Sequence, residues 1–279
     1  MTAAGAIRGR AVRGERVDLG GRCLRVVRAG PPGAQPLVLL EHGAFGCAAD
    51  WAVVQERLAA QGLRSLAYDR AGLGHSDPGP SPRDGRAIVS DAERLLERVG
   101  EDGPLVLVGH SMGGLMVRLF ALVRPERVLG LVLVDAMTPD VIRLPAGREA
   151  IGSFAGVLRL AGVGADLGLM RPVSLITGNL IGLTGEAAVE KRRIHASAPH
   201  ARGAADEVGS WAATSEQAAA ADLPASLPVA VITAGGERRR PWLKRLQTVP
   251  ALASEHGYVE HVARATHASL LGPRFADPV

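Results

Sequence analysis

A serine flanked by glycines stands at the end of one of the most apolar stretches of the chain. Residues 105–108 read Leu-Val-Leu-Val, and Gly-His-Ser-Met-Gly follows at 109–113. This Gly-x-Ser-x-Gly pattern, before a predicted helix at residues 115–123, is typical of a sharp turn that exposes a strained nucleophilic serine. A tight structural turn with an incidental serine is the alternative, and the strand–turn–helix context favours Ser111 as a nucleophile.

A serine hydroxyl needs a general base to act as a nucleophile near neutral pH. The chain offers eight histidines for this role: His42, His75, His110, His195, His200, His256, His261 and His267. The two cysteines, Cys23 and Cys47, are too few for a disulfide framework or a four-ligand zinc site.

Short apolar runs that alternate with helical patterns must position these side chains. The sequence predicts strands at residues 37–40, 63–68, 105–108, 131–134, 228–233 and 258–263, and helices at 51–61, 88–99, 115–123 and 242–252. Strands that are apolar on both faces indicate a parallel sheet covered by helices. Right-handed crossovers bring the C-terminal ends of such strands to one edge, where open α/β sheets carry their chemistry.

The pattern changes after residue 137. Glycine, alanine and short helical stretches replace strands as far as about residue 221, and the strand pattern then resumes. We therefore predict an α/β core formed by residues 1–137 and 222–279, with a helical cap inserted at residues 138–221.

Four motifs together resemble the α/β-hydrolase superfamily. They are Gly-His-Ser-Met-Gly-Gly at 109–114, His-Gly at 42–43, Asp-Arg-Ala-Gly-Leu-Gly-His-Ser-Asp at 69–77, and Thr-His at 266–267. The match is continuous over residues 37–135 and looser over 228–271. It implies an α/β-hydrolase fold, with a mostly parallel central sheet, flanking helices and an inserted helical cap. It also implies a triad in the chain order nucleophile, acid, base.

On this resemblance His267 is the base, and two residues compete for the acid. Asp135 closes the strand that follows the nucleophile helix, 24 residues beyond Ser111, where one group of relatives carries the acid. Glu237 lies in the loop where many other relatives carry an Asp. We favour Asp135, because Glu237 stands beside three arginines that compete for its charge. A helix cap or loop anchor is the alternative role for Asp135.

The oxyanion hole should come from two backbone N–H groups. The first belongs to Met112, directly after the nucleophile. By resemblance, the second belongs to Ala44, with Phe45 as the fallback. Asp69 and Arg70 resemble a structural loop of the family, and we interpret them as scaffold.

The composition excludes several other classes of protein. The 32 Lys and Arg residues exceed the 28 Asp and Glu residues by four, but the arginines are spread along the whole chain and only 3% of residues are aromatic. A nucleic-acid partner is therefore not expected. We interpret the densest basic runs, at residues 191–193 and 238–240, as solvated faces.

No targeting or membrane-spanning segment is predicted. Residues 1–16 are basic but lack the apolar region of a secretory signal. Charges and glycines interrupt the most apolar region, residues 151–183, so no run reaches the roughly 18 apolar residues of a membrane span. The expectation is a soluble, cytoplasmic protein.

These observations predict a serine hydrolase that cleaves carboxylic esters with a small-to-medium hydrophobic acyl or alcohol group, without metal or organic cofactor. Serine at position 111 argues against dehalogenase and epoxide-hydrolase chemistry. Enzymes of those two kinds resemble this fold but use an Asp nucleophile. Amidase, lactonase, thioesterase, acyltransferase, carbon–carbon hydrolase or cofactor-free haloperoxidase activity at the same triad remains an alternative, as does a non-catalytic ligand-binding receptor.

The insertion either forms an apolar lid over Ser111 or buries its apolar side within the protein. Prolines at 273 and 278 predict that no long helix follows His267.

Overall fold

A computed structural model describes residues 13–33, 36–143 and 145–279. Most of the basic N-terminal segment therefore lies outside the described residues. Within them, no helix combines the length and the apolar character that crossing a membrane requires.

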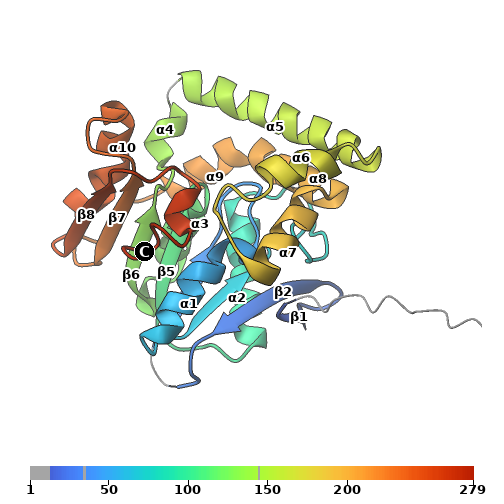
Figure 1. Ribbon diagram of the computed structural model, residues 1–279. Coiled ribbons are helices and arrows are strands. Elements are labelled where there is room, and N and C mark those ends of the chain that lie inside the picture. The colour runs from blue at the N-terminus through green and yellow to red at the C-terminus, as the bar shows by residue number, and fades with distance from the viewer. Residues whose placement is uncertain (1–12, 34–35, 144) are drawn as a thin grey trace, which may run out of the picture.

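An eight-stranded sheet forms the centre of the molecule (Figure 1). Its strands lie in the order β1-β2-β4-β3-β5-β6-β7-β8. The strands from β4 to β8 in this order all pair in parallel. The strand β2 pairs antiparallel with both β1 and β4. The predicted α/β architecture with a mostly parallel sheet is thus confirmed. The strand bounds are β1 (Glu15–Asp18), β2 (Cys23–Ala29), β3 (Leu37–Glu41), β4 (Ser65–Tyr68), β5 (Leu105–His110), β6 (Val128–Val134), β7 (Val229–Ala234) and β8 (Gly257–Val262).

Successive side chains of a strand point to opposite sides of the sheet. Both faces are apolar because consecutive residues of the central strands are apolar. In β3, Leu37 and Leu39 join one buried cluster while Val38 and Leu40 join the other. The helices α2 (Gly85–Arg98), α3 (Gly113–Val123) and α10 (Pro241–Leu252) contribute to the first cluster. The helix α1 (Ala52–Ala60), which follows the 3₁₀ turn η1 (Ala48–Trp51), contributes to the second.

The sequence reading did not predict β1 and β2. Charged residues interrupt both strands, and Arg25 in β2 is 1% exposed. Its guanidinium is neutralised by Asp69 and by Glu190, which lies 165 residues further along the chain. A buried arginine that takes its partners from distant segments hides the apolar pattern by which a strand is recognised.

Six helices lie between β6 and β7 in the described chain. They are α4 (Pro139–Arg143), α5 (Pro145–Asp166), α6 (Met170–Thr177), α7 (Gly185–His195), α8 (Ala198–Gly209) and α9 (Trp211–Ala218). The longest, α5, packs on α8, and α9 packs on α2 and α3 of the core. Figure 1 shows α5 running along the outer side of this group, away from the sheet.

The chain after β8 returns to the α1 side of the sheet. Within the described residues it forms only the 3₁₀ turn η3 (Ser269–Leu271), whose Leu270 and Leu271 are buried in the second cluster. His267 lies in the short loop between β8 and η3. Burial of the two leucines anchors this loop directly beside the histidine.

Candidate active site

Ser111 sits in the turn between β5 and α3, in a left-handed backbone conformation with φ of 54°. Such a conformation is strained for a residue with a side chain, and strain of this kind is typical of functional turns. The turn is held by the Ser111 N–H, which donates to the Val134 carbonyl over 3.1 Å. It also requires glycine at position 113, where a Cβ would lie 2.3 Å from the Glu41 oxygen.

Asp135 follows β6, the strand next to β5, and so lies at the same edge of the sheet. Its Oδ1 accepts hydrogen bonds from the Ala234 N–H and from Gln247 Nε2, both over 3.2 Å. Burial alone would raise the pKa of this carboxyl, but hydrogen bonding and the charge of His267, together with these two donors, outweigh burial and lower it. Asp135 is therefore a carboxylate at neutral pH.

The structure brings His267 and Asp135 together. His267 Nδ1 lies 2.6 Å from Asp135 Oδ2, within charge-assisted hydrogen-bond distance. The His267 side chain is 51% exposed, whereas that of Asp135 is 14% exposed. His110 Nε2 donates to the His267 carbonyl over 3.0 Å, and the two rings lie 4.5 Å apart. Burial, assisted by the nearby charge of His267, lowers the pKa of His110 to about 3, so His110 stays neutral.

The loop after β3 lies directly against the serine. A Cβ at Gly43 would be 2.9 Å from the Ser111 Cβ, so only glycine allows this approach. Ala44 follows and lines the same cavity as Ser111. Met112 is the N-cap residue of α3, so its N–H lies at the positive end of that helix. Phe45 is left-handed, with φ of 55°.

Side chains of α7 and α8 hold Phe45 in that conformation. Lys191 Nζ and His200 Nε2 each lie 3.4 Å from the Phe45 carbonyl oxygen. The Gly74 N–H donates to His200 Nδ1, so Nε2 carries the proton that points to Phe45. The Phe45 ring lies 4.7 Å from the ring of His195 and 4.6 Å from that of His200. The loop that carries Ala44 is therefore braced by α7 and α8.

Lys191 corrects one interpretation made from the sequence. The basic run at residues 191–193 is predicted to be a solvated face, but Lys191 is 8% exposed and pairs with Asp50 over 2.7 Å. Burial alone would lower the pKa of Lys191, and the charge of Asp50 outweighs burial and raises it to about 12. No local pattern indicates this pair, because the partners are 141 residues apart.

The residues near Ser111 enclose a cavity of about 200 Å³, here called the Ser111 pocket. Its lining includes the polar side chains of Asp50, Lys191 and His195. It also includes the apolar side chains of Phe154, Leu180 and Ile181. The complete lining is Gly43, Ala44, Phe45, Asp50, His110, Ser111, Phe154, Thr177, Gly178, Leu180, Ile181, Lys191, His195, His267 and Ala268.

The other sequence candidates lie away from this chemistry. Glu237 is exposed in the loop after β7 and does not line the Ser111 pocket. Asp69 accepts from the Ala48 and His75 N–H groups and so ties the turn η1 to the connection between β4 and α2. Arg70 is 1% exposed and pairs with Glu41 and Glu207. Asp69 and Arg70 are scaffold, as the sequence predicted, and Arg70 also joins the core to α8.

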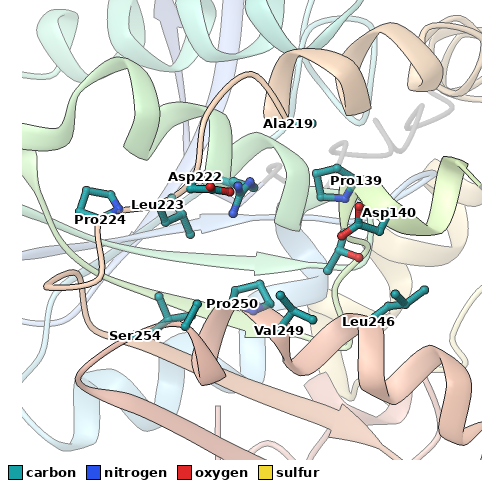
Figure 2. Close-up of a pocket in the computed structure, with 14 residues that line it drawn as sticks. Pro139, Asp140, Ala219, Asp222, Leu223, Pro224, Leu246, Val249, Pro250 and Ser254 are labelled. Carbon is teal, nitrogen blue, oxygen red and sulfur yellow. The ribbon is translucent and has the colours of Figure 1, made fainter.

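A separate cavity of about 300 Å³ lies between α10 and the two connections that join the cap to the core. Figure 2 shows Pro139 and Asp140 on one side of it, with Val249 and Pro250 of α10 on the other. Ser111, Asp135 and His267 are not among its lining residues.

Comparisons with known proteins agree with the fold. A family model described as alpha/beta hydrolase fold matches residues 36–152. An AB hydrolase superfamily protein of Gibberella zeae is 39% identical over 114 residues, which are 38% of this chain and 35% of that protein. An epoxide hydrolase 2 of Siraitia grosvenorii is 39% identical over 102 residues, 36% of this chain and 32% of its own length. The chain thus spans about a third of the length of these curated relatives.

Solved structures extend the likeness beyond the matched segment. A thermophilic esterase from Thermogutta terrifontis superposes with a TM-score of 0.68 and 23% identity, over 93% of both chains. At this identity the likeness concerns the fold alone. The family model over residues 36–152 and the superposed structure agree, and the chain has the α/β-hydrolase fold.

Proposed function

We propose that the protein is a serine hydrolase that cleaves carboxylic esters through an acyl-enzyme at Ser111. The observation that carries the proposal is the 2.6 Å contact between His267 Nδ1 and Asp135 Oδ2, beside a strained serine in the same pocket. A carboxylate on Nδ1 fixes the histidine tautomer whose free Nε2 can take a proton. That is the requirement for activating a serine hydroxyl.

In this mechanism Ser111 Oγ attacks the ester carbonyl carbon while His267 Nε2 accepts the hydroxyl proton. The carbonyl oxygen becomes an oxyanion, to which the N–H groups of Ala44 and Met112 donate. Collapse breaks the bond to the alcohol, which leaves with the proton from His267. Water then attacks the acyl-enzyme with the same base, and Ser111 is regenerated. Removing one oxyanion donor typically costs roughly 3–4 kcal/mol of transition-state stabilisation.

The lining of the Ser111 pocket supports an ester with an apolar acyl or alcohol group. Phe154, Leu180 and Ile181 supply apolar surface to this lining. Each methylene buried against such a surface adds about 0.8 kcal/mol of binding free energy. We also propose that residues 138–221, with helices α4–α9, act as the cap that supplies this surface.

A nucleophilic serine separates this proposal from epoxide hydrolysis. One curated relative is named epoxide hydrolase 2, but the residue at position 111 here is Ser. In the chemistry proposed, the alkoxide of serine forms an acyl ester, so the substrate must contain an acyl carbon. An epoxide offers none.

A panel of p-nitrophenyl esters of increasing acyl length tests the proposal. We expect turnover that rises from acetate to medium chains and that falls by more than about 100-fold in Ser111→Ala and in His267→Ala. The rate should rise with pH through a single titration, as expected when a base must lose its proton. A flat profile with chemistry rate-limiting, or full activity in Ser111→Ala, contradicts the proposal.

A further inference from the structure

One side of the cap carries large apolar side chains that remain exposed in the described structure. Six of them, on α5, in the turn after it and on α6, define what we call the apolar cap face: Val157 (58% exposed), Leu160 (72%), Val163 (58%), Leu167 (69%), Leu175 (69%) and Ile176 (82%). Single exposed apolar residues need no explanation, but a set of this size on two helices that contact each other points to an interaction surface.

The pattern of α5 shows why this face is unusual. Ala155 and Leu158 are 3% and 2% exposed and belong to the main buried cluster, on the side where α5 packs on α8. Val157, Leu160 and Val163 repeat at helical spacing but remain more than half exposed. A surface helix ordinarily has a polar outer side, and a helix that is apolar all round is normally buried. Within the described residues, nothing covers the outer side of α5.

The apolar cap face continues to the mouth of the Ser111 pocket. Phe154 on α5 and Leu180 after α6 are 36% and 67% exposed, and both also line that pocket. Whatever covers the face therefore reaches the rim through which substrate approaches Ser111. A partner that sealed the face would block the pocket, whereas a surface that itself holds apolar esters would supply it.

The charges near the face indicate the polarity of that surface. Arg159 on α5 and Arg171 on α6 are exposed. Glu149 near the start of α5 is exposed as well, and the other acidic residue of the stretch, Asp166, is paired with Arg202 over 2.8 Å. Two-fold pairing of two copies through this face would bring like-charged arginines towards each other. An anionic surface instead neutralises the arginines while it buries the apolar side chains.

We propose that the apolar cap face docks on an anionic lipid surface, from which an apolar ester enters the Ser111 pocket. The identity of the delivered substrate rests on the proposed ester hydrolysis, whereas the docking does not. Helices α5 and α6 lie in the plane of the interface, with their apolar side chains among the acyl chains and their arginines at the headgroups.

Flotation with two kinds of vesicle tests the docking directly. The full chain is mixed with vesicles of phosphatidylcholine and phosphatidylglycerol, or of phosphatidylcholine alone, and the bound fraction is measured. We expect binding to the anionic vesicles that weakens with added salt. The double substitution of Leu175→Ser and Ile176→Ser should weaken this binding at least about tenfold. It removes several methyl and methylene groups that docking would bury in the lipid. Neither residue lines the Ser111 pocket, so turnover of dissolved p-nitrophenyl acetate should change less than twofold.

The matched control is Leu252→Ser, which alters a leucine that is 75% exposed on α10, outside the apolar cap face. It should bind vesicles like the original protein. If the double variant proves unstable in a thermal melt, Leu160→Ser on α5 provides the same test. Absence of vesicle binding would overturn the proposal. So would binding that neither the double variant nor Leu160→Ser weakens, or a dimer that the substitutions on α5 and α6 dissociate. Vesicle binding without any ester turnover would retain the docking surface and reject the proposed reaction.

Discussion

Replacing Asp135 with Asn changes one atom of the proposed triad and leaves its shape intact. The outcome depends on how the new amide is oriented. Asp135 Oδ1 accepts hydrogen bonds from the Ala234 N–H and from Gln247 Nε2. An Asn at this position keeps both bonds only if its oxygen takes the Oδ1 place. Its NH₂ group then faces His267 Nδ1.

That orientation forces the wrong tautomer on the histidine. An NH₂ donor opposite Nδ1 requires a lone pair there, so the proton moves to Nε2, and Nε2 can no longer accept the Ser111 proton. The contact also loses a carboxylate at 2.6 Å that would stabilise the imidazolium. We therefore expect kcat to fall by roughly 10³–10⁴, which corresponds to about 4–5.5 kcal/mol of barrier.

Steady-state kinetics on a soluble p-nitrophenyl ester measures this effect, with thermal unfolding as the check on folding. The matched control is Glu237→Gln, which neutralises the competing acid in the exposed loop after β7. Its kcat should change less than about tenfold, as for a solvated carboxylate. If Glu237→Gln lost activity on the scale of the triad and Asp135→Asn did not, the acid would be Glu237 and the reasoning from Asp135 would be wrong.

Three further predictions concern pH and the buried charges. Because the pKa of Asp135 is lowered on folding, its contribution to stability is present above its unfolded pKa of about 3.9 and is lost as the pH falls through the lower folded value. Urea unfolding should therefore show a gap between the original protein and Asp135→Asn that narrows in acid. Arg70→Met leaves two buried carboxylates unpaired and should lower the free energy of unfolding by about 3–5 kcal/mol. The control Arg202→Met, at an exposed pair, should lower it by less than about 1 kcal/mol, and urea unfolding measures both. Lys191→Met should lower kcat more than it raises KM, because it releases the brace on Phe45; an effect on KM alone would place Lys191 in substrate binding only.

Local patterns were sufficient for the elements that carry the proposed triad. The apolar strands predicted at residues 105–108 and 131–134 lie within β5 and β6. The sequence alone therefore placed the adjacent Ser111 and Asp135 at one edge of the sheet. The position of His267 depended on resemblance, because no local pattern distinguishes it from seven other histidines. Its contact with Asp135 joins residues 132 positions apart.

The features that escaped prediction are those set by long-range charge. Arg25 pairs with Glu190 across 165 residues, which disguised β2 as a polar segment. Lys191 reads as part of a basic surface run until Asp50 is placed beside it. In each case a buried charge is tolerated only because a distant segment supplies its partner, and composition alone does not reveal that partner.

Covalent labelling by a fluorophosphonate probe tests the central claim most directly, because the probe reacts only with an activated serine. After labelling of the full chain, peptide mass spectrometry identifies the modified residue. The account predicts a single adduct on Ser111, no adduct in Ser111→Ala, and labelling slowed by at least about 10³-fold in His267→Ala. A folded protein that does not react, an adduct on another residue, or undiminished labelling in His267→Ala would contradict it.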